Sequence, residues 1–205
     1  MNILNIVSSP RGDQSFSIKL ADAIIGKLLE DTPGSTVTTR DLATNPFPHL
    51  EAAKLQSLFT PAPDRTPEQQ LAAKHSDDAI AEVQAADIIV IGAPLYNFGI
   101  PSVLKAWIDH ICRAGITFKY VNGQPQGLVT GKKVYIAMAS GGIYSEGPAA
   151  SNDFVAPYLQ AVLSFIGLTD VTVVRVEGVS IPGLQDTALA KALATLQPEL
   201  ADEAI

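Results

Sequence analysis

The sequence predicts an α/β fold in which a five-stranded parallel sheet carries helices on both faces. Five short apolar or β-branched runs alternate with five segments of helical periodicity along the 205 residues. Such alternation favours parallel strands joined by right-handed helical crossovers. The run at 88–91 is unbroken Ile and Val, which is typical of a central strand that is covered on both faces. No repeat or low-complexity tract interrupts the chain, so we expect one domain over residues 1–205.

Each predicted strand is a run bounded by turn-forming residues. The five runs occupy residues 3–7, 36–40, 88–91, 134–139 and 171–176. The second run is more polar than the others, so we expect it at an edge of the sheet. Gly92 and Pro94 are expected to end the third strand.

The predicted helices show apolar residues at intervals of three and four positions. They occupy residues 15–29, 67–86, 101–112, 153–166 and 184–200. Thr66 followed by Pro67 is typical of a helix start, and Gly115 and Gly167 are typical of positions where helices stop. Pro157 introduces a possible kink into the fourth helix.

Two connecting segments differ from ordinary loops. Residues 45–66 are rich in proline and weakly periodic, so we expect no regular structure there. Within this segment Phe59 to Thr66 is either a lid over a site or an inert loop. Residues 116–127 contain Asn122-Gly123 and predict a small two-stranded ribbon.

Composition excludes several classes of protein. Charged residues make up 17% of the chain, hydrophobic residues 47%, and the formal net charge is −7, which excludes a disordered chain. No apolar run approaches the roughly 18 residues of a membrane span. The acidic balance without a Lys/Arg cluster predicts no nucleic-acid or membrane partner. The surplus of apolar over charged residues points to extra buried surface, such as a subunit interface or an enclosed aromatic ligand.

The single cysteine and the scattered histidines give little support to a metal or redox site. Cys112 has no partner for an internal disulfide and is expected in the core, on the apolar stripe of its helix. His110 is expected at the surface. No basic stretch precedes the first apolar run, so we expect no signal peptide and a cytoplasmic location.

Three unusual loops follow the first, third and fourth strands, at residues 8–17, 94–100 and 140–147. Ligands of open α/β sheets bind beyond the carboxyl ends of the strands, so these loops belong to one candidate site. The first loop contains four serines near a helix start and one cation, Arg11. Hydroxyl and free N–H groups at a helix N-terminus suit a phosphate monoester. The alternative is ordinary helix capping by Ser15 or Ser17.

The other two loops suit a flat ring. Tyr96, Asn97 and Phe98 crowd the end of the third strand, where two aromatic rings suit stacking on, or framing, such a ring. Gly141 and Gly142 allow close backbone approach after the fourth strand. The alternatives are a tight turn with packed aromatics and a simple glycine turn. Walker A, dinucleotide-fingerprint and serine-elbow motifs are absent, and flavin mononucleotide (FMN) explains all three loops together.

The chain resembles the FMN-dependent NADH-azoreductases, which are related to the NAD(P)H:quinone oxidoreductases, nearly from end to end. The most specific matching strings are Pro94-Leu95-Tyr96-Asn97-Phe98 and Arg113-Ala114-Gly115-Ile116-Thr117-Phe118. The resemblance implies a flavodoxin-like fold with strand order 2-1-3-4-5 and a homodimer with two FMN sites. It also implies ping-pong transfer of hydride from NADH or NADPH to the flavin, and then to a quinone or azo compound.

The resemblance also implies roles for individual residues. Those expected to bind the cofactor are Ser9, Arg11, Ser15, Phe16, Ser17, Pro94, Leu95, Tyr96, Asn97, Phe98, Ser140, Gly141, Gly142 and Tyr144. Tyr144 and Asn97 are the candidates for a catalytic contribution at the flavin. Phe59, Phe118 and Tyr120 are expected in the substrate pocket on the dimer side, and the alternative for Phe118 and Tyr120 is an ordinary surface hairpin. Two alternatives stay open, namely an FMN electron carrier without substrate turnover and a flavin-free scaffold of the same fold.

Overall fold

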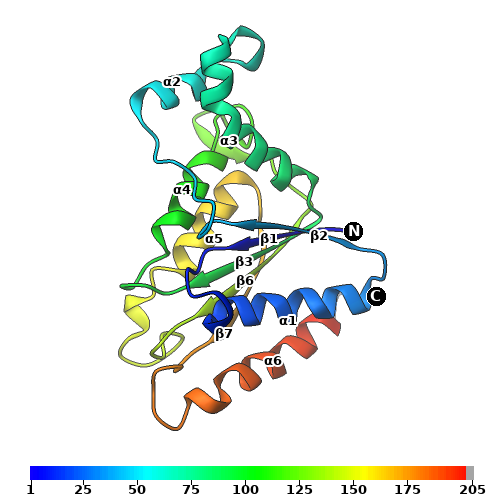
Figure 1. Cartoon of the computed structure of the whole chain (residues 1–205), viewed down its shortest axis with the longest axis vertical. Helices are drawn as coiled ribbons and strands as arrows, with labels where there is room; N and C mark the ends of the chain where they lie inside the picture. Colours follow the sequence, from blue (N-terminus) through cyan, green and yellow to red (C-terminus); the bar gives the residue numbers. More distant parts are fainter. Residues whose placement is uncertain (202–205) are drawn as a thin grey trace.

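The computed structural model describes residues 1–201 and contains a central sheet of five parallel strands, in the order β2-β1-β3-β6-β7 (Figure 1). These strands are β1 Asn2–Val7, β2 Thr36–Asp41, β3 Ile88–Pro94, β6 Lys133–Ala139 and β7 Asp170–Val176. The polar second strand lies at an edge, as predicted. The labels β4 and β5 belong to a separate two-stranded hairpin, so the observed order does not match the expected 2-1-3-4-5 number for number. The fourth and fifth strands of the main sheet are therefore β6 and β7. Residues 202–205 of the expected domain lie outside the described residues.

Helices cover both faces of the sheet (Figure 1). On one face lie α1 (Phe16–Asp31) and α6 (Gln185–Ala201), which pack on a cluster that includes Val90 and Tyr135. On the other face lie α3 (Pro67–Ala85), α4 (Ser102–Ile111) and α5 (Ala156–Ile166). Trp107 of α4 is fully buried in this second cluster. The two-layer cover explains why β3 is buried along its whole length.

Some predicted boundaries are wrong for local reasons. The strand β3 continues through Gly92 to Pro94, because these residues keep the parallel pairing with Ala137 to Ala139 of β6. The helix α4 ends at Ile111, before Gly115. The helix α5 begins at Ala156, so Pro157 lies in its first turn and introduces no kink.

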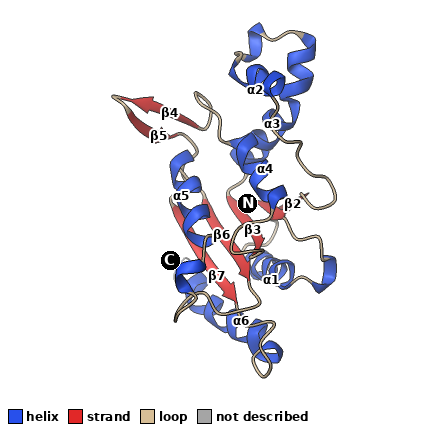
Figure 2. Ribbon diagram, turned by 90° about the vertical axis from the view of Figure 1, so that its left-hand side faces the viewer, coloured by secondary structure: helices blue, strands red, loops and turns tan. Residues whose placement is uncertain are grey.

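The predicted ribbon is present as an antiparallel hairpin of β4 (Phe118–Val121) and β5 (Gln124–Gly127). Because α4 runs back along the sheet after β3, the hairpin projects at the amino ends of the strands (Figure 2). The loops that follow β1, β3 and β6 lie at the opposite edge.

The proline-rich segment is more ordered than its composition predicts. It contains the helix α2 (Ala52–Phe59) and a short 3-10 turn at Ala62–Asp64. The sequence Ala52-Ala53-Lys54-Leu55-Gln56 consists of good helix formers, and no proline occurs between Pro48 and Pro61. The helix α2 packs on α3 and stands away from the sheet, which α3 itself contacts (Figure 1).

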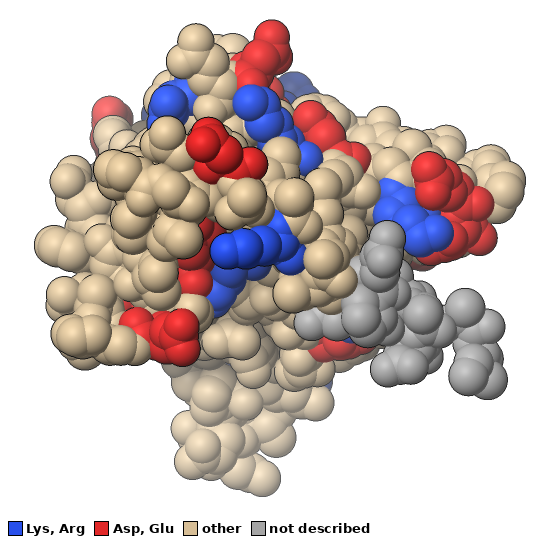
Figure 3. Space-filling view, turned by 90° about the horizontal axis from the view of Figure 1, so that it is seen from below, with Lys and Arg blue, Asp and Glu red and all other residues tan. Residues whose placement is uncertain are grey.

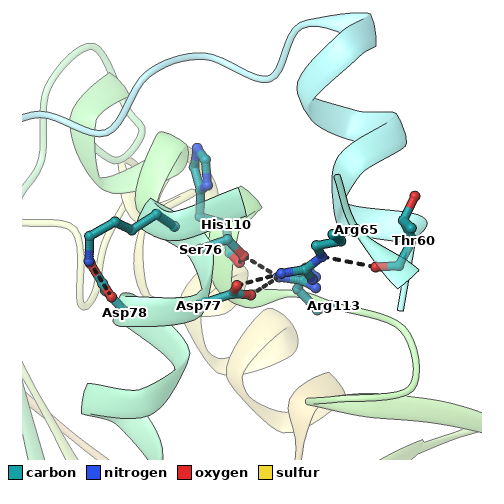
Figure 4. A network of polar contacts seen from close by, with 8 residues as sticks. Thr60, Arg65, Ser76, Asp77, Asp78, His110 and Arg113 are labelled. Atoms are coloured by element: carbon teal, nitrogen blue, oxygen red, sulfur yellow. Dashed lines mark hydrogen bonds and ion pairs between the residues drawn. The ribbon is translucent and has the colours of Figure 1, made fainter. Parts of the chain in front are cut away.

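A polar network fastens this region to the body of the protein (Figure 4). The guanidinium groups of Arg65 and Arg113 donate to the two carboxylate oxygens of Asp77, at 2.5 and 2.9 Å. Arg113 also donates to Ser76 Oγ at 2.8 Å, and Arg65 Nε donates to the carbonyl of Thr60 at 3.0 Å. Both arginine side chains are almost fully buried, so the carboxylate compensates two charges removed from water.

His110 is buried, which corrects the expectation of a surface residue. Its Nε2 lies 2.9 Å from the carbonyl oxygen of Pro48, and its ring lies 5.2 Å from that of Phe47. Burial lowers the pKa of His110, and the hydrogen bond to Pro48 opposes that shift in part. Cys112 packs against the core as expected, and burial raises the pKa of its thiol to about 11.

Charged side chains of both signs lie in small separate groups over the face seen in Figure 3, with uncharged surface between them. In residues 1–201 no helix is both long and apolar enough to cross a membrane. Nor does any group of three or more His, Cys, Asp or Glu within the described part of the chain have an arrangement that could hold a metal ion.

Candidate functional site

The three predicted loops meet at the carboxyl edge of the sheet, around a depression of about 200 Å³. Its lining comes from the segments that follow β1, β3, β6 and β7. The lining residues are Arg11, Ser15, Phe16, Pro94, Leu95, Tyr96, Ala139, Ser140, Gly141, Val179 and Ser180. The depression lies where the strand order reverses between β1 and β3, which is the usual ligand position in such sheets.

The serine loop brings buried hydroxyl groups to the start of α1. Ser15 caps the helix through its Oγ, which accepts from the N–H of Ile18 at 3.4 Å and lies 3.0 Å from Ser17 Oγ. Ser9, Ser15 and Ser17 are all buried. The first N–H groups of α1, at Phe16 and Ser17, have no acceptor within the helix. Capping therefore occurs, and it leaves N–H and hydroxyl groups available for an anion.

Ser8 has a different role from the other serines of this loop. Its hydroxyl donates to the carbonyl of Gly92 at 2.6 Å and joins the ends of β1 and β3. Ser9 Oγ lies 3.3 Å from the hydroxyl of Tyr96, so it links the first loop to the second. Arg11 is exposed at the rim of the depression.

The second loop is a tight turn closed by two backbone hydrogen bonds of 3.0 Å between Tyr96 and Gly99. Its central residues, Asn97 and Phe98, have φ of 49° and 71°, which is the pattern of a type I′ turn. Positive φ suits asparagine but strains a bulky aromatic residue, and such strain clusters at functional sites. The Phe98 side chain is 47% exposed, so the turn presents an apolar aromatic surface to the solvent.

The two glycines of the third loop lie close to neighbouring side chains. A Cβ at Gly141 would lie 2.9 Å from Ser180 Oγ, and one at Gly142 would lie 3.2 Å from the ring of Tyr144. The Tyr144 ring makes an edge contact with the Phe98 ring at a centroid distance of 6.4 Å. The second and third loops are therefore in direct contact.

Sequence reasoning missed the fourth contributor, the segment after β7. Gly178 and Ser180 donate backbone N–H groups to the carbonyls of Gly142 and Gly141, at 3.0 and 3.1 Å. Val179 and Ser180 also line the depression. A signal was present, because residues 177–180 follow the fifth predicted strand and so must reach the same edge.

The remaining predicted residues lie outside the depression. Asn97 lines an adjoining cavity of about 390 Å³, which also contains Ser8 and Ile100. Phe118 packs its ring 4.3 Å from that of Phe165, and Tyr120 lies beside it on the hairpin at the other edge of the sheet. Phe59 is 70% exposed at the end of α2. Within this chain the described contacts do not bring Phe59, Phe118 and Tyr120 to the loops.

A family model described as flavodoxin-like fold matches residues 1–200. An FMN-dependent NADH:quinone oxidoreductase of Herminiimonas arsenicoxydans is 55% identical over 178 residues, which are 87% of each chain. Another of the same name, from Agrobacterium fabrum, is 50% identical over 99% of both chains. Among solved structures, an azoreductase of Bacillus anthracis is 32% identical, covers 100% of this chain and 98% of its own, and superposes with a TM-score of 0.85. An FMN-dependent NADH-azoreductase of the same species, solved in complex with FMN, is 27% identical over 100% of both chains with a TM-score of 0.87.

Proposed function

Since the chain belongs to the family of flavodoxin-like proteins that includes the FMN-dependent NADH:quinone oxidoreductases, we propose that it is an FMN-dependent enzyme that oxidises NADH and reduces quinones and azo compounds. The observation that carries the proposal is the meeting of the serine loop, the Tyr96–Gly99 turn and the paired glycines at one edge of the sheet.

The residues at this edge fit FMN. The buried hydroxyls of Ser9, Ser15 and Ser17 and the free N–H groups of α1 form a site for a phosphate monoester. Gly141 lines the depression, and neither Gly141 nor Gly142 has a side chain that would keep a flat ring from the backbone. When bound, FMN supplies two-electron redox chemistry between NADH and a quinone or azo acceptor.

The protein residues then bind the ring and stabilise the negative charge on it. The central residues of the turn, Asn97 and Phe98, have N–H groups that the turn does not use. We assign the N–H groups of Asn97 and Gly142 to the polar edge of the ring, where they stabilise negative charge. Tyr144, beside Gly142 and Phe98, is assigned to the same edge as a modest contributor. If NADH and the acceptor occupy the site in turn, initial-rate plots should give the parallel lines of a ping-pong mechanism.

We further propose that the protein is a homodimer in the cytoplasm and that residues 1–205 form one domain. Large apolar side chains are exposed at Phe59 (70%), Leu71 (73%) and Tyr120 (64%), and a second copy of the chain would supply a surface to cover them. The hairpin carrying Phe118 and Tyr120 lies at the edge opposite the site (Figure 2). Phe118 and Tyr120 therefore contribute to a substrate pocket only if the hairpin reaches the site of a second copy.

Replacing a phosphate-loop serine tests the site. Ser17→Ala should weaken FMN binding to the apoprotein by about 0.5–1.5 kcal/mol, because one hydrogen bond to the phosphate is lost. Riboflavin lacks the phosphate, so its affinity should stay unchanged. Ser57→Ala is the matched control, since that buried hydroxyl bonds only to Ala53 within α2. Equal losses of FMN and riboflavin affinity would remove Ser17 from the phosphate site.

Turnover separates the enzyme from an electron carrier. The FMN-loaded protein is titrated anaerobically with NADH, and a quinone and an azo dye are then added in turn. The proposal expects bleaching by NADH and recovery of flavin absorbance with each acceptor. A protein that binds FMN but exchanges no electrons with NADH would be a carrier, and one that takes up no FMN would be a flavin-free scaffold.

A further inference from the structure

A half-buried carboxylate binds the backbone of the third loop. Glu177, directly after β7, accepts the backbone N–H groups of Tyr144 and Ser145 on one oxygen, at 2.7 and 2.9 Å. Its side chain is 14% exposed. Hydrogen bonds from N–H groups to a carboxylate are stronger than those to a neutral oxygen. The carboxylate therefore fixes the backbone that carries the Tyr144 ring.

An arginine connects this carboxylate to a second one. Arg175 Nη1 lies 3.9 Å from Glu177, and its Nη2 donates to Asp153 at 2.7 Å. The Asp153 side chain is 5% exposed, and its other oxygen accepts the N–H groups of Val155 and Ala156 at the start of α5. One guanidinium thus compensates two carboxylates that are largely removed from water.

The start of α5 in turn holds the second loop. The N–H of Phe154, next to Asp153, donates to the carbonyl of Phe98 at 3.1 Å. A continuous set of contacts therefore runs from the Phe98 turn through Asp153, Arg175 and Glu177 to Tyr144. The two ends of this set meet again where the rings of Phe98 and Tyr144 touch.

We propose that Glu177, whose charge Arg175 compensates from 3.9 Å, is a positioning residue that fixes the Tyr144 loop at the distance from the Phe98 turn that the flavin ring requires. The inference rests on the proposed function, because it concerns the ring site of that enzyme. The two loops follow β3 and β6, which pair as far as Pro94 and Ala139, and the Glu177–Arg175–Asp153 set adds a side-chain connection beyond these strand ends. Glu177 also occupies the N–H groups of Tyr144 and Ser145, so those donors are turned away from the ring and Gly142 is left to serve it.

Flavin binding by the apoprotein tests the inference with three variants. Glu177→Ala removes both acceptors and should weaken FMN and riboflavin equally, by about tenfold, because the ring site and not the phosphate site is disturbed. Glu177→Asp should do the same, since its carboxylate is withdrawn by one methylene from the two N–H groups. Glu177→Gln keeps an acceptor oxygen and should stay within about threefold of the wild type. The bound-flavin absorption spectrum should shift in the first two variants and not in the third.

The outcomes separate this inference from the proposed function. Wild-type protein that takes up neither flavin overturns the function itself. Wild-type protein that binds FMN, while Glu177→Ala binds both flavins as tightly, overturns the positioning role alone. A loss of FMN affinity without a loss of riboflavin affinity would also overturn it, because the change would then act at the phosphate. If Glu177→Ala does not fold, the comparison between Glu177→Asp and Glu177→Gln decides the question in the same way.

Discussion

Asp77→Ala removes the carboxylate that two buried guanidinium groups share. Arg65 then keeps only its bond to the carbonyl of Thr60, and Arg113 keeps its bond to Ser76. The arginine side chains are 3% and 4% exposed, so water reaches them poorly and their charges lose most of their compensation. We expect the protein to lose stability through these two unpaired charges.

The exposure of Asp77 sets the size of the loss. Breaking a fully buried pair costs about 3–5 kcal/mol, whereas exposed pairs contribute about 0–1 kcal/mol. The Asp77 side chain is 43% exposed, so part of the interaction is screened by water. The free energy of unfolding should therefore fall by about 2–3 kcal/mol.

Urea unfolding followed by circular dichroism measures this loss. The matched control is Asp78→Ala at the next position, whose 49% exposed carboxylate pairs with Lys74 one helical turn away. That variant should lose only about 0.3–0.5 kcal/mol. A loss below about 0.5 kcal/mol for Asp77→Ala, or equal losses for the two variants, would refute the reasoning that burial makes this network important.

Three further predictions concern single residues. Gly167→Ala should destabilise by about 3 kcal/mol or more, since φ is +107° and the new Cβ would lie 2.7 Å from the carbonyl oxygen of Val129. The control Gly115→Ala, at φ +78° with open space around the new Cβ, should cost only about 1–2 kcal/mol. If both variants lose the same free energy of unfolding, the contact with Val129 is not the cause of the loss at Gly167. The Cys112 thiol, with its pKa raised to about 11, should react with iodoacetamide at pH 8 about 100-fold more slowly than a free thiol, and reaction at the free-thiol rate would disprove its burial. Burial lowers the pKa of His110, so the unfolded chain binds the proton more tightly. The free energy of unfolding should then decline as pH falls below about 6.5, and His110→Gln should flatten that decline in urea titrations at several pH values.

The sequence was most informative where a local pattern has a local cause. Ser15 caps α1 and Thr66 caps α3 because each provides a hydroxyl just before a helical run, and Gly167 ends α5 in the left-handed conformation. The prediction failed for α2, where flanking prolines concealed a stretch of good helix formers. The prediction also failed for His110, whose imidazole contacts the carbonyl of Pro48, 62 positions earlier in the chain. The periodicity of the helix that carries His110 contains no information about that distant loop.

For the site, too, one part follows from the sequence and another part only from the tertiary structure. Strand order and loop position follow from the alternation of strands and helices, so the sequence by itself determined that the serine loop, the Tyr96–Gly99 turn and the paired glycines share one edge. The side-chain set that holds these loops was decided only by tertiary structure. Glu177 lies 33 positions from Tyr144, and Asp153 lies 22 positions from Arg175. Residues so far apart in sequence show no periodicity that would reveal their contact, and only the tertiary structure brings the end of β7 within hydrogen-bond distance of the third loop and of the segment before α5.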